Sequence, residues 1–305
     1  MQPVVDPQRF FEPGLAGYIA YCVEFLIRYF LLAGGLYWAL QVAFRKRWLS
    51  FRIQDTFPGR AEVRHEILWS MSNMACTGLA TVLMYHLVRN GDASMYFDAG
   101  ERGWAYFALS PLLVLAGYDT WIYWQHRWMH SDFMFRHVHW IHHRVGNPTP
   151  LATFAQHPLE TFLGNAFFVL FVAYVPIHPL ALAAAGGYMF LYGIIGHLGY
   201  EFFPRWFARN PLLGFVNTST YHNMHHTHMR CNYAAWFLFW DRALGTNHPD
   251  YLDVYDEVTA RRAPWREVLG LSPQPVADQR DADNGGFQLT SGECAAKVRN
   301  SPARS

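Results

Sequence analysis

The sequence predicts an all-α integral membrane protein, with about five membrane-embedded helices and a cytoplasmic, histidine-rich helical cap. Hydrophobic residues make up 52% of the 305 residues and charged residues only 15%, whereas soluble domains average about 25% charged residues. Long apolar runs recur between residues 15 and 200. Histidines gather in the polar segments that follow these runs. A net charge of +1 gives no indication of nucleic-acid binding.

Five apolar segments are candidate membrane helices. They cover residues 15–44, 67–88, 104–125, 161–177 and 180–200. A spanning helix needs about 20 residues, and all but the short fourth segment meet this length. Glu24 and Arg28 interrupt the first segment, but their i,i+4 spacing lets them neutralise each other. The alternative is the buried core of a soluble protein, which five such runs in a short chain disfavour.

Loop charges predict the orientation in the membrane. The segment after the first apolar run is basic and should be cytoplasmic; it carries Arg45, Lys46, Arg47, Arg52, Arg60 and Arg64. The loop after the second run carries Asp92, Asp98 and Glu101 and should lie outside. With five crossings, the histidine-rich segments then share the cytoplasmic side of a bacterial inner membrane or the endoplasmic reticulum. No basic leader precedes the first run, so we expect no signal peptide.

Eight of the 16 histidines occur in three motifs with the spacing of metal ligands. The motifs are His126 and His130; His139, His142 and His143; and His222, His225 and His226. On a helix, each set lies along one face. Neutral imidazole binds iron, copper and zinc. Because one ion takes about four to six ligands, eight imidazoles predict two metals, or one metal with many surrounding histidines.

Three further residues are candidates for the same site. His157 precedes an expected helix start, with Pro158 at N1 and Glu160 at N3, so it should stand near the motifs and is a candidate metal ligand. His197 lies in the last apolar run, where it is expected to bind metal or to contact a ligand. Asp119 shares a helical face with His126. We expect it to accept a histidine N–H and fix the tautomer; the alternative is an aspartate at the membrane interface.

The chain divides into three predicted parts. Residues 1–102 form N-terminal membrane helices, 103–271 form a histidine-containing catalytic domain, and 272–305 form a polar, disordered tail.

The three motifs resemble the HxxxH, HxxHH and HxxHH signature of the fatty acid hydroxylase/sterol desaturase superfamily. They read HRWMH from 126, HVHWIHH ending at 143 and YHNMHH ending at 226. The runs NPTPLATFAQHPLE and NYAAWFLFWDRALGT are similar to the surroundings of the second and third motifs in that family. The first of these runs looks closest to the sterol C5-desaturase branch.

The resemblance implies a membrane enzyme with two histidine-bound irons. Such enzymes use O₂ and electrons from cytochrome b5, ferredoxin or a similar carrier to desaturate or hydroxylate a lipid C–H bond. A sterol or related terpenoid is the first expected substrate, and fatty acyl or carotenoid hydroxylation is the alternative. A different class of function is a non-enzymatic metal carrier or a haem membrane protein.

Overall fold

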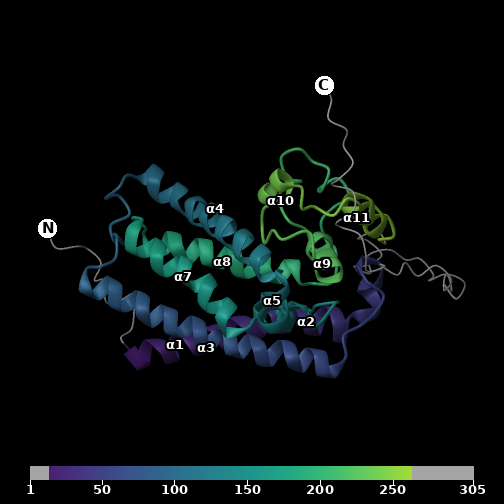
Figure 1. Ribbon diagram of the computed structural model, residues 1–305, viewed down its shortest axis with the longest axis horizontal. Helices are drawn as coiled ribbons and strands as arrows, with labels where there is room; N and C mark the ends of the chain where they lie inside the picture. Colours follow the sequence, from purple (N-terminus) through teal and green to yellow (C-terminus); the bar gives the residue numbers. More distant parts are fainter. Residues whose placement is uncertain (1–13, 263–305) are drawn as a thin grey trace, which may run out of the picture.

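Five long helices lie side by side and carry a small helical cap at one end (Figure 1). The computed structural model describes residues 14–262; in that range it is helical, with three isolated bridge pairs and no extended strand. The long helices are α1 (Gly14–Arg28), α3 (Arg60–Asn90), α4 (Trp104–Met129), α7 (Pro158–Tyr174) and α8 (Pro179–Gly196). The all-α prediction is therefore confirmed.

The first apolar segment forms one rod over Gly14–Ala43. After α1 it continues as a π-helical turn (Tyr29–Gly34), α2 (Gly35–Tyr37) and a second π-helical turn (Trp38–Ala43). Glu24 and Arg28 form the expected ion pair, with 3.3 Å between Arg28 Nη1 and Glu24 Oε1. The rod contributes buried Phe25 and Tyr29 to a core shared with Phe190 and Ile194 of α8.

Two His-Pro pairs start the last two long helices. His157 and His178 are the N-caps of α7 and α8, and each Nδ1 accepts the backbone N–H two residues on at 3.1 Å. The proline at N1 has no N–H to satisfy and a φ suited to the helix. Pro158 and Pro179 thus fix where α7 and α8 begin.

Short helices form the cap. They are 3₁₀ turns at Arg45–Phe51 and Pro150–Phe154, α5 (Asp132–Met134), a π-helical turn at Phe135–His139, α6 (Trp140–His143), α9 (Ser219–His228), α10 (Phe239–Leu244) and α11 (Tyr251–Ala260). The buried side chains of Tyr221 and Met224 from α9 pack with those of Val254 and Tyr255 from α11.

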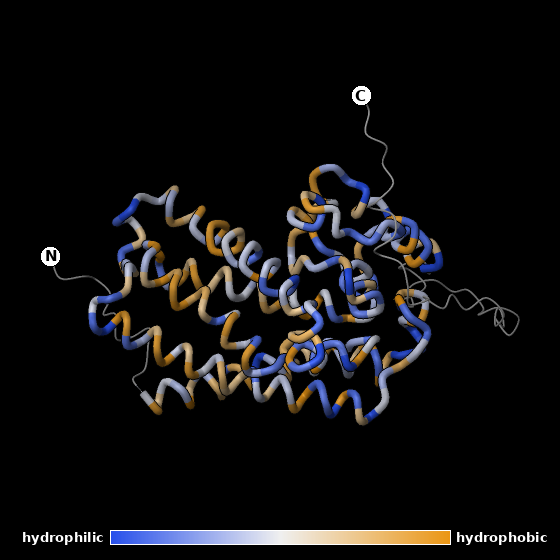
Figure 2. Tube along the Cα trace, viewed as in Figure 1, coloured by the Kyte–Doolittle hydropathy of each residue, from blue (hydrophilic) through white to orange (hydrophobic). Residues whose placement is uncertain are grey.

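Four helices are long and apolar enough to cross a membrane: Gly14–Ala43, Arg60–Asn90, Trp104–Met129 and Pro179–Gly196. The fourth predicted segment forms α7, which has 17 residues because the chain leaves the helix at Val175 before Pro176. Large apolar side chains on the bundle, such as Leu31, Leu79 and Leu109, are more than half exposed, as lipid-facing residues would be. Hydrophobic residues follow the long helices (Figure 2). The protein is an integral membrane protein, and a fifth crossing stays a prediction.

The basic and acidic loops lie at opposite ends of the bundle (Figure 1). Ile53 donates its N–H to Gly199 O beyond the end of α8. Tyr96, in the acidic loop, donates its N–H to Ile177 O at the α7–α8 turn. The histidine motifs share the basic end, as loop charge predicted. The compartment and the division into parts at residues 102 and 271 stay predictions, and the expected disordered tail falls outside the described residues.

Candidate metal centre

Nine histidines from four parts of the chain converge at the end of the bundle that carries the cap. His126 and His130 end α4, the second motif spans the π-helical turn and α6, His197 follows α8, and α9 carries the third motif. Seven of the nine are buried, and His126 and His130 are half-buried. The π-helical turn that contains His139 is an insertion often found at functional sites.

The nine side chains form two clusters. The five-histidine cluster contains His126, His130, His139, His143 and His225. The four-histidine cluster contains His142, His197, His222 and His226. Within each cluster, one ring nitrogen per residue lies within 4.8 Å of all the others. Each HxxHH motif divides between the clusters, so the second and third motifs hold the two clusters next to each other.

Hydrogen bonds to fixed acceptors set the tautomers of five histidines. The Nδ1 atoms donate to Tyr233 O (His126, 2.8 Å), Ala155 O (His142, 3.3 Å), Gly193 O (His197, 2.8 Å), Cys231 O (His225, 2.6 Å) and Glu160 Oε2 (His139, 3.0 Å). Because a carbonyl oxygen only accepts, Nδ1 carries the proton at the first four. In a neutral ring, Nε2 is then left with a lone pair.

These lone pairs face one another. His197 Nε2 lies 3.4 Å from His142 Nε2, although both rings carry their proton on Nδ1. No proton therefore stands between these two atoms, and the contact is repulsive unless a cation binds both. His226 is fully buried, and neither of its ring nitrogens has a hydrogen-bond partner among the described residues. This donor set fits a transition metal in each cluster.

Burial keeps these imidazoles uncharged. It lowers the pKa of His225 to about 3 and that of His197 to about 4. Burial, reinforced by neighbouring histidines, also holds the pKa of His142, His143 and His222 well below the ordinary value of 6.5. A neutral ring is the form that binds metal, so the clusters are prepared for it at neutral pH.

Glu160, rather than Asp119, is the carboxylate that contacts a clustered histidine. Glu160 is only 5% exposed at the N3 position of α7 and accepts from His139 Nδ1 at 3.0 Å. The expectation that Asp119 accepts a histidine N–H is corrected: its Oδ1 accepts the backbone N–H groups of Trp236 and Phe237 at 3.2 and 3.1 Å. The helical spacing from His126 predicted the direction of the Asp119 side chain, but the loop at 233–237, rather than a histidine, lies in that direction.

Asp119 affects the site indirectly, because it binds the loop at 233–237. Asp241 accepts the N–H groups of Tyr233 and Ala234 at 3.1 and 2.6 Å, and Asp119 holds the following turn. The Tyr233 carbonyl held in this way accepts from His126 Nδ1. The two aspartates therefore position the loop that orients one clustered histidine.

His157 is not part of either cluster, which corrects its prediction as a metal ligand. Its Nδ1 caps α7 and its ring stacks on Trp69 at 6.2 Å. His197, predicted as a ligand or ligand neighbour, lies within the four-histidine cluster. Sequence reasoning missed the contact between Glu160 and His139, although a helix that starts at Pro158 has Glu160 in its first turn.

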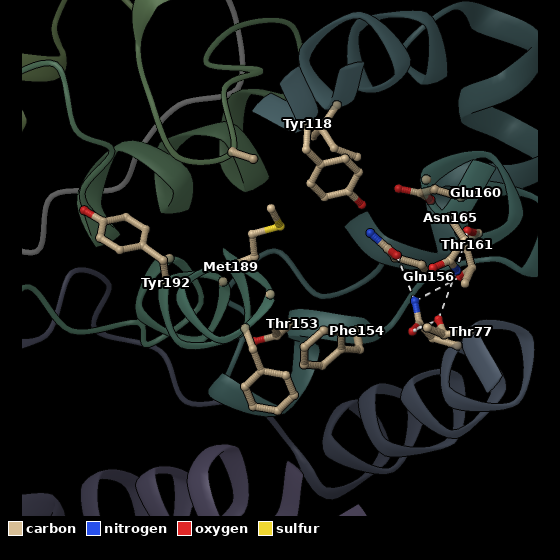
Figure 3. A pocket seen from close by; sticks show the side chains of 18 of the residues that line it. Thr77, Tyr118, Thr153, Phe154, Gln156, Glu160, Thr161, Asn165, Met189 and Tyr192 are labelled. Atoms are coloured by element: carbon tan, nitrogen blue, oxygen red, sulfur yellow. Dashed lines mark hydrogen bonds between the residues drawn. The ribbon is translucent and has the colours of Figure 1, made fainter. Parts of the chain in front are cut away.

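A cavity of about 290 Å³ leads from the bundle to both clusters. Its lining includes His126 and His139 of one cluster and His142, His197 and His222 of the other. Its other walls come from the long helices α1, α3, α4, α7 and α8, from the chain at residues 153–156 and from the loop at Ala235 and Trp236. Figure 3 shows part of this lining. The cavity thus brings the inside of the helix bundle into contact with histidines of both clusters.

A family model described as "Fatty acid hydroxylase" matches residues 111–246, the segment that holds all nine clustered histidines. Over this segment the chain is similar to proteins of the fatty acid hydroxylase family. It is 29% identical over 191 residues to a lathosterol oxidase of Rattus norvegicus and 27% identical over 227 residues to a Delta(7)-sterol 5(6)-desaturase of Gibberella zeae. These matches cover 62% and 73% of this chain, and 62% of each relative. No solved structure gives a significant match.

Proposed function

We propose that this protein belongs to the fatty acid hydroxylase/sterol desaturase superfamily and is an O₂-dependent, di-iron membrane oxidoreductase that desaturates or hydroxylates a lipid C–H bond, with a sterol or related terpenoid as the first candidate. One observation carries the proposal: a cavity walled by membrane helices ends at histidines of two adjacent clusters. The names of the relatives, lathosterol oxidase and Delta(7)-sterol 5(6)-desaturase, support the substrate class.

Two irons would be held by the five- and four-histidine clusters and would supply the activation of O₂ and the removal of hydrogen. The protein orients the imidazoles through the Tyr233, Ala155, Gly193 and Cys231 carbonyls and Glu160. In a desaturation, the substrate gives up two electrons and two protons. A carrier such as cytochrome b5 or ferredoxin gives two electrons, and O₂ with two further protons leaves as water. The basic end of the bundle supports a cytoplasmic active site.

The test is metal analysis together with turnover of a Δ7-sterol. Purified protein should hold close to two irons and, with O₂ and an electron carrier, should convert the sterol to a product that has lost two hydrogens or gained an oxygen. His142→Ala and His225→Ala remove a ligand from different clusters and should lower iron and turnover together. His137→Ala is the matched control, because His137 lies in the same segment but bonds to its own helix through Phe133 O.

Normal turnover in an iron-free, zinc-loaded preparation would contradict the proposal. Zinc found after overexpression would not, because zinc binds such sites well. A haem spectrum would indicate the non-enzymatic alternative class.

A further inference from the structure

A polar side-chain cluster lies in the cavity, between α3 and the start of α7. It consists of Asn73, Thr77, Gln156, Thr161 and Asn165, all of which line the cavity (Figure 3). Polar groups at membrane depth are costly unless they are satisfied, and they usually mark a functional path. Within residues 14–262, none of the hydrogen bonds of these five side chains goes to a clustered histidine, so the histidine centre does not account for them.

Hydrogen bonds hold the cluster in a fixed arrangement. Asn73 Nδ2 donates to Gln156 Oε1 and to Thr161 Oγ1, both at 3.0 Å. Thr77 Oγ1 donates to Asn73 Oδ1 at 3.3 Å and accepts from Asn165 Nδ2 at 3.0 Å. The side chains are therefore preorganised rather than free to turn away from a ligand.

Two groups on the cavity wall keep unused hydrogen-bonding capacity. Gln156 uses Oε1 within the cluster, which leaves its Nε2 donors without a partner among the described residues. The hydroxyl of Tyr118 on α4 also has no hydrogen bond in the described part of the chain, and it points into the space beside Gln156 (Figure 3). Both offer a hydrogen bond to a polar group that enters the cavity.

Two residues of the polar cluster are next in sequence to residues that orient the clustered histidines. Gln156 directly follows Ala155, whose carbonyl orients His142, and Thr161 directly follows Glu160, which contacts His139. A polar group bound there would therefore sit beside the clusters, with its carbon skeleton along aromatic walls such as Phe154 and Phe190.

The charges of the cavity lining favour the binding of a neutral polar group over that of a carboxylate. Arg28 is the one arginine or lysine of the cavity lining, and Glu24 neutralises it at 3.3 Å. Glu160 is the one acidic residue of the lining, and it is engaged by His139. Amide and hydroxyl groups without net charge suit an alcohol, which can donate and accept at once.

We propose that the cluster around Gln156 and Thr77, together with the Tyr118 hydroxyl, binds the hydroxyl group of a lipid alcohol and so sets which C–H bond faces the metal centre. This inference rests on the proposed function for its catalytic meaning, but binding can be measured without turnover.

The experiment measures binding of two alcohols and their O-methyl ethers to the full chain in detergent: a Δ7-sterol and hexadecan-1-ol. Methylation removes the hydroxyl donor and leaves the skeleton unchanged. We expect wild-type protein to prefer the free alcohol about five- to tenfold in at least one pair, as for one buried hydrogen bond. Gln156→Leu and Thr77→Val should abolish that preference, whereas Thr77→Ser should keep it. Thr81→Val, one turn further along α3 and outside the cavity, is the matched control.

Equal binding of alcohol and ether by wild-type protein in both pairs would overturn the inference, whether or not any variant folds. A preference that survives both Gln156→Leu and Thr77→Val would overturn it as well. Failure of the proposed function would show differently: neither alcohol would be oxidised under O₂ while the wild-type preference persisted.

Discussion

At the scale of single residues, the acceptors of the histidine N–H groups decide what the site can bind. Backbone carbonyls fix the tautomers of His126, His142, His197 and His225, so their Nε2 lone pairs converge. Glu160 is the one side chain among these acceptors. It is therefore the residue whose change tests orientation without removing a ligand.

Glu160→Gln should lower metal affinity or turnover by about 10–100-fold, because a neutral amide is a weaker acceptor for His139 Nδ1. Asp119→Asn should cost less, because an amide oxygen can still accept the Trp236 and Phe237 N–H groups. Iron content and turnover are the measurements, and Asp132→Asn, on an exposed carboxylate beside the first motif, is the control. A larger loss for Asp119→Asn than for Glu160→Gln would contradict the assignment of Glu160.

The free energy of unfolding should fall as the pH drops below about 6.5. Burial lowers the pKa of the clustered histidines, including His197 to about 4 and His225 to about 3, so the folded protein keeps them neutral. The unfolded chain takes up protons below about pH 6.5. Above that value these groups leave the free energy of unfolding unchanged; below it, they lower it progressively until the folded protein also takes up protons, near pH 4 for His197 and near pH 3 for His225. Thermal unfolding between pH 7.5 and 5 measures this, and folded protein should keep its iron over that range because the clustered histidines stay neutral; an unfolding temperature that stays constant below pH 6.5 would contradict the prediction.

At the scale of elements, the His-Pro pairs show how a histidine can serve a helix rather than a metal. His157 and His178 each accept an N–H at the start of a long apolar helix. The helix start at Pro158 also brings Glu160 to His139, so the geometry of α7 and of the metal centre are connected through one turn.

His157→Ala should lower stability by about 1 kcal/mol through loss of the N-cap, with close to full iron content per folded protein. His157→Asn should restore most of that stability, because asparagine is a good N-cap. Thermal unfolding and iron analysis would test this beside His142→Ala, which should lose iron. A loss of iron in His157→Asn as large as in His142→Ala would show that His157 is a ligand after all.

At the scale of the whole molecule, the bundle separates the acidic loop from the basic end and the metal centre. Asp92 stands beyond the end of α3, whereas Asp253 is highly exposed on α11 of the cap. If the bundle spans the membrane, these two positions face opposite compartments.

Single cysteines at Asp92 and Asp253, in a chain without native cysteines, should therefore be labelled from opposite sides of the membrane. An impermeant thiol reagent should reach Asp92→Cys from outside and Asp253→Cys only after permeabilisation. Labelling of both positions from one side would contradict the predicted orientation.

Helices and metal-ligand motifs could be predicted because both depend on local spacing. The apolar runs located the five long helices, with ends that differ from the observed ones by up to seven residues, and i,i+3,i+4 spacing placed His139, His142 and His143 on one face. Only the tertiary structure shows how the nine histidines divide into clusters of five and four. It also shows that Glu160 contacts His139 and that Asp119 binds the 233–237 loop instead of a histidine. The reason is physical: spacing within one helix gives the direction of a side chain, but its partner is whichever remote segment folds into that space.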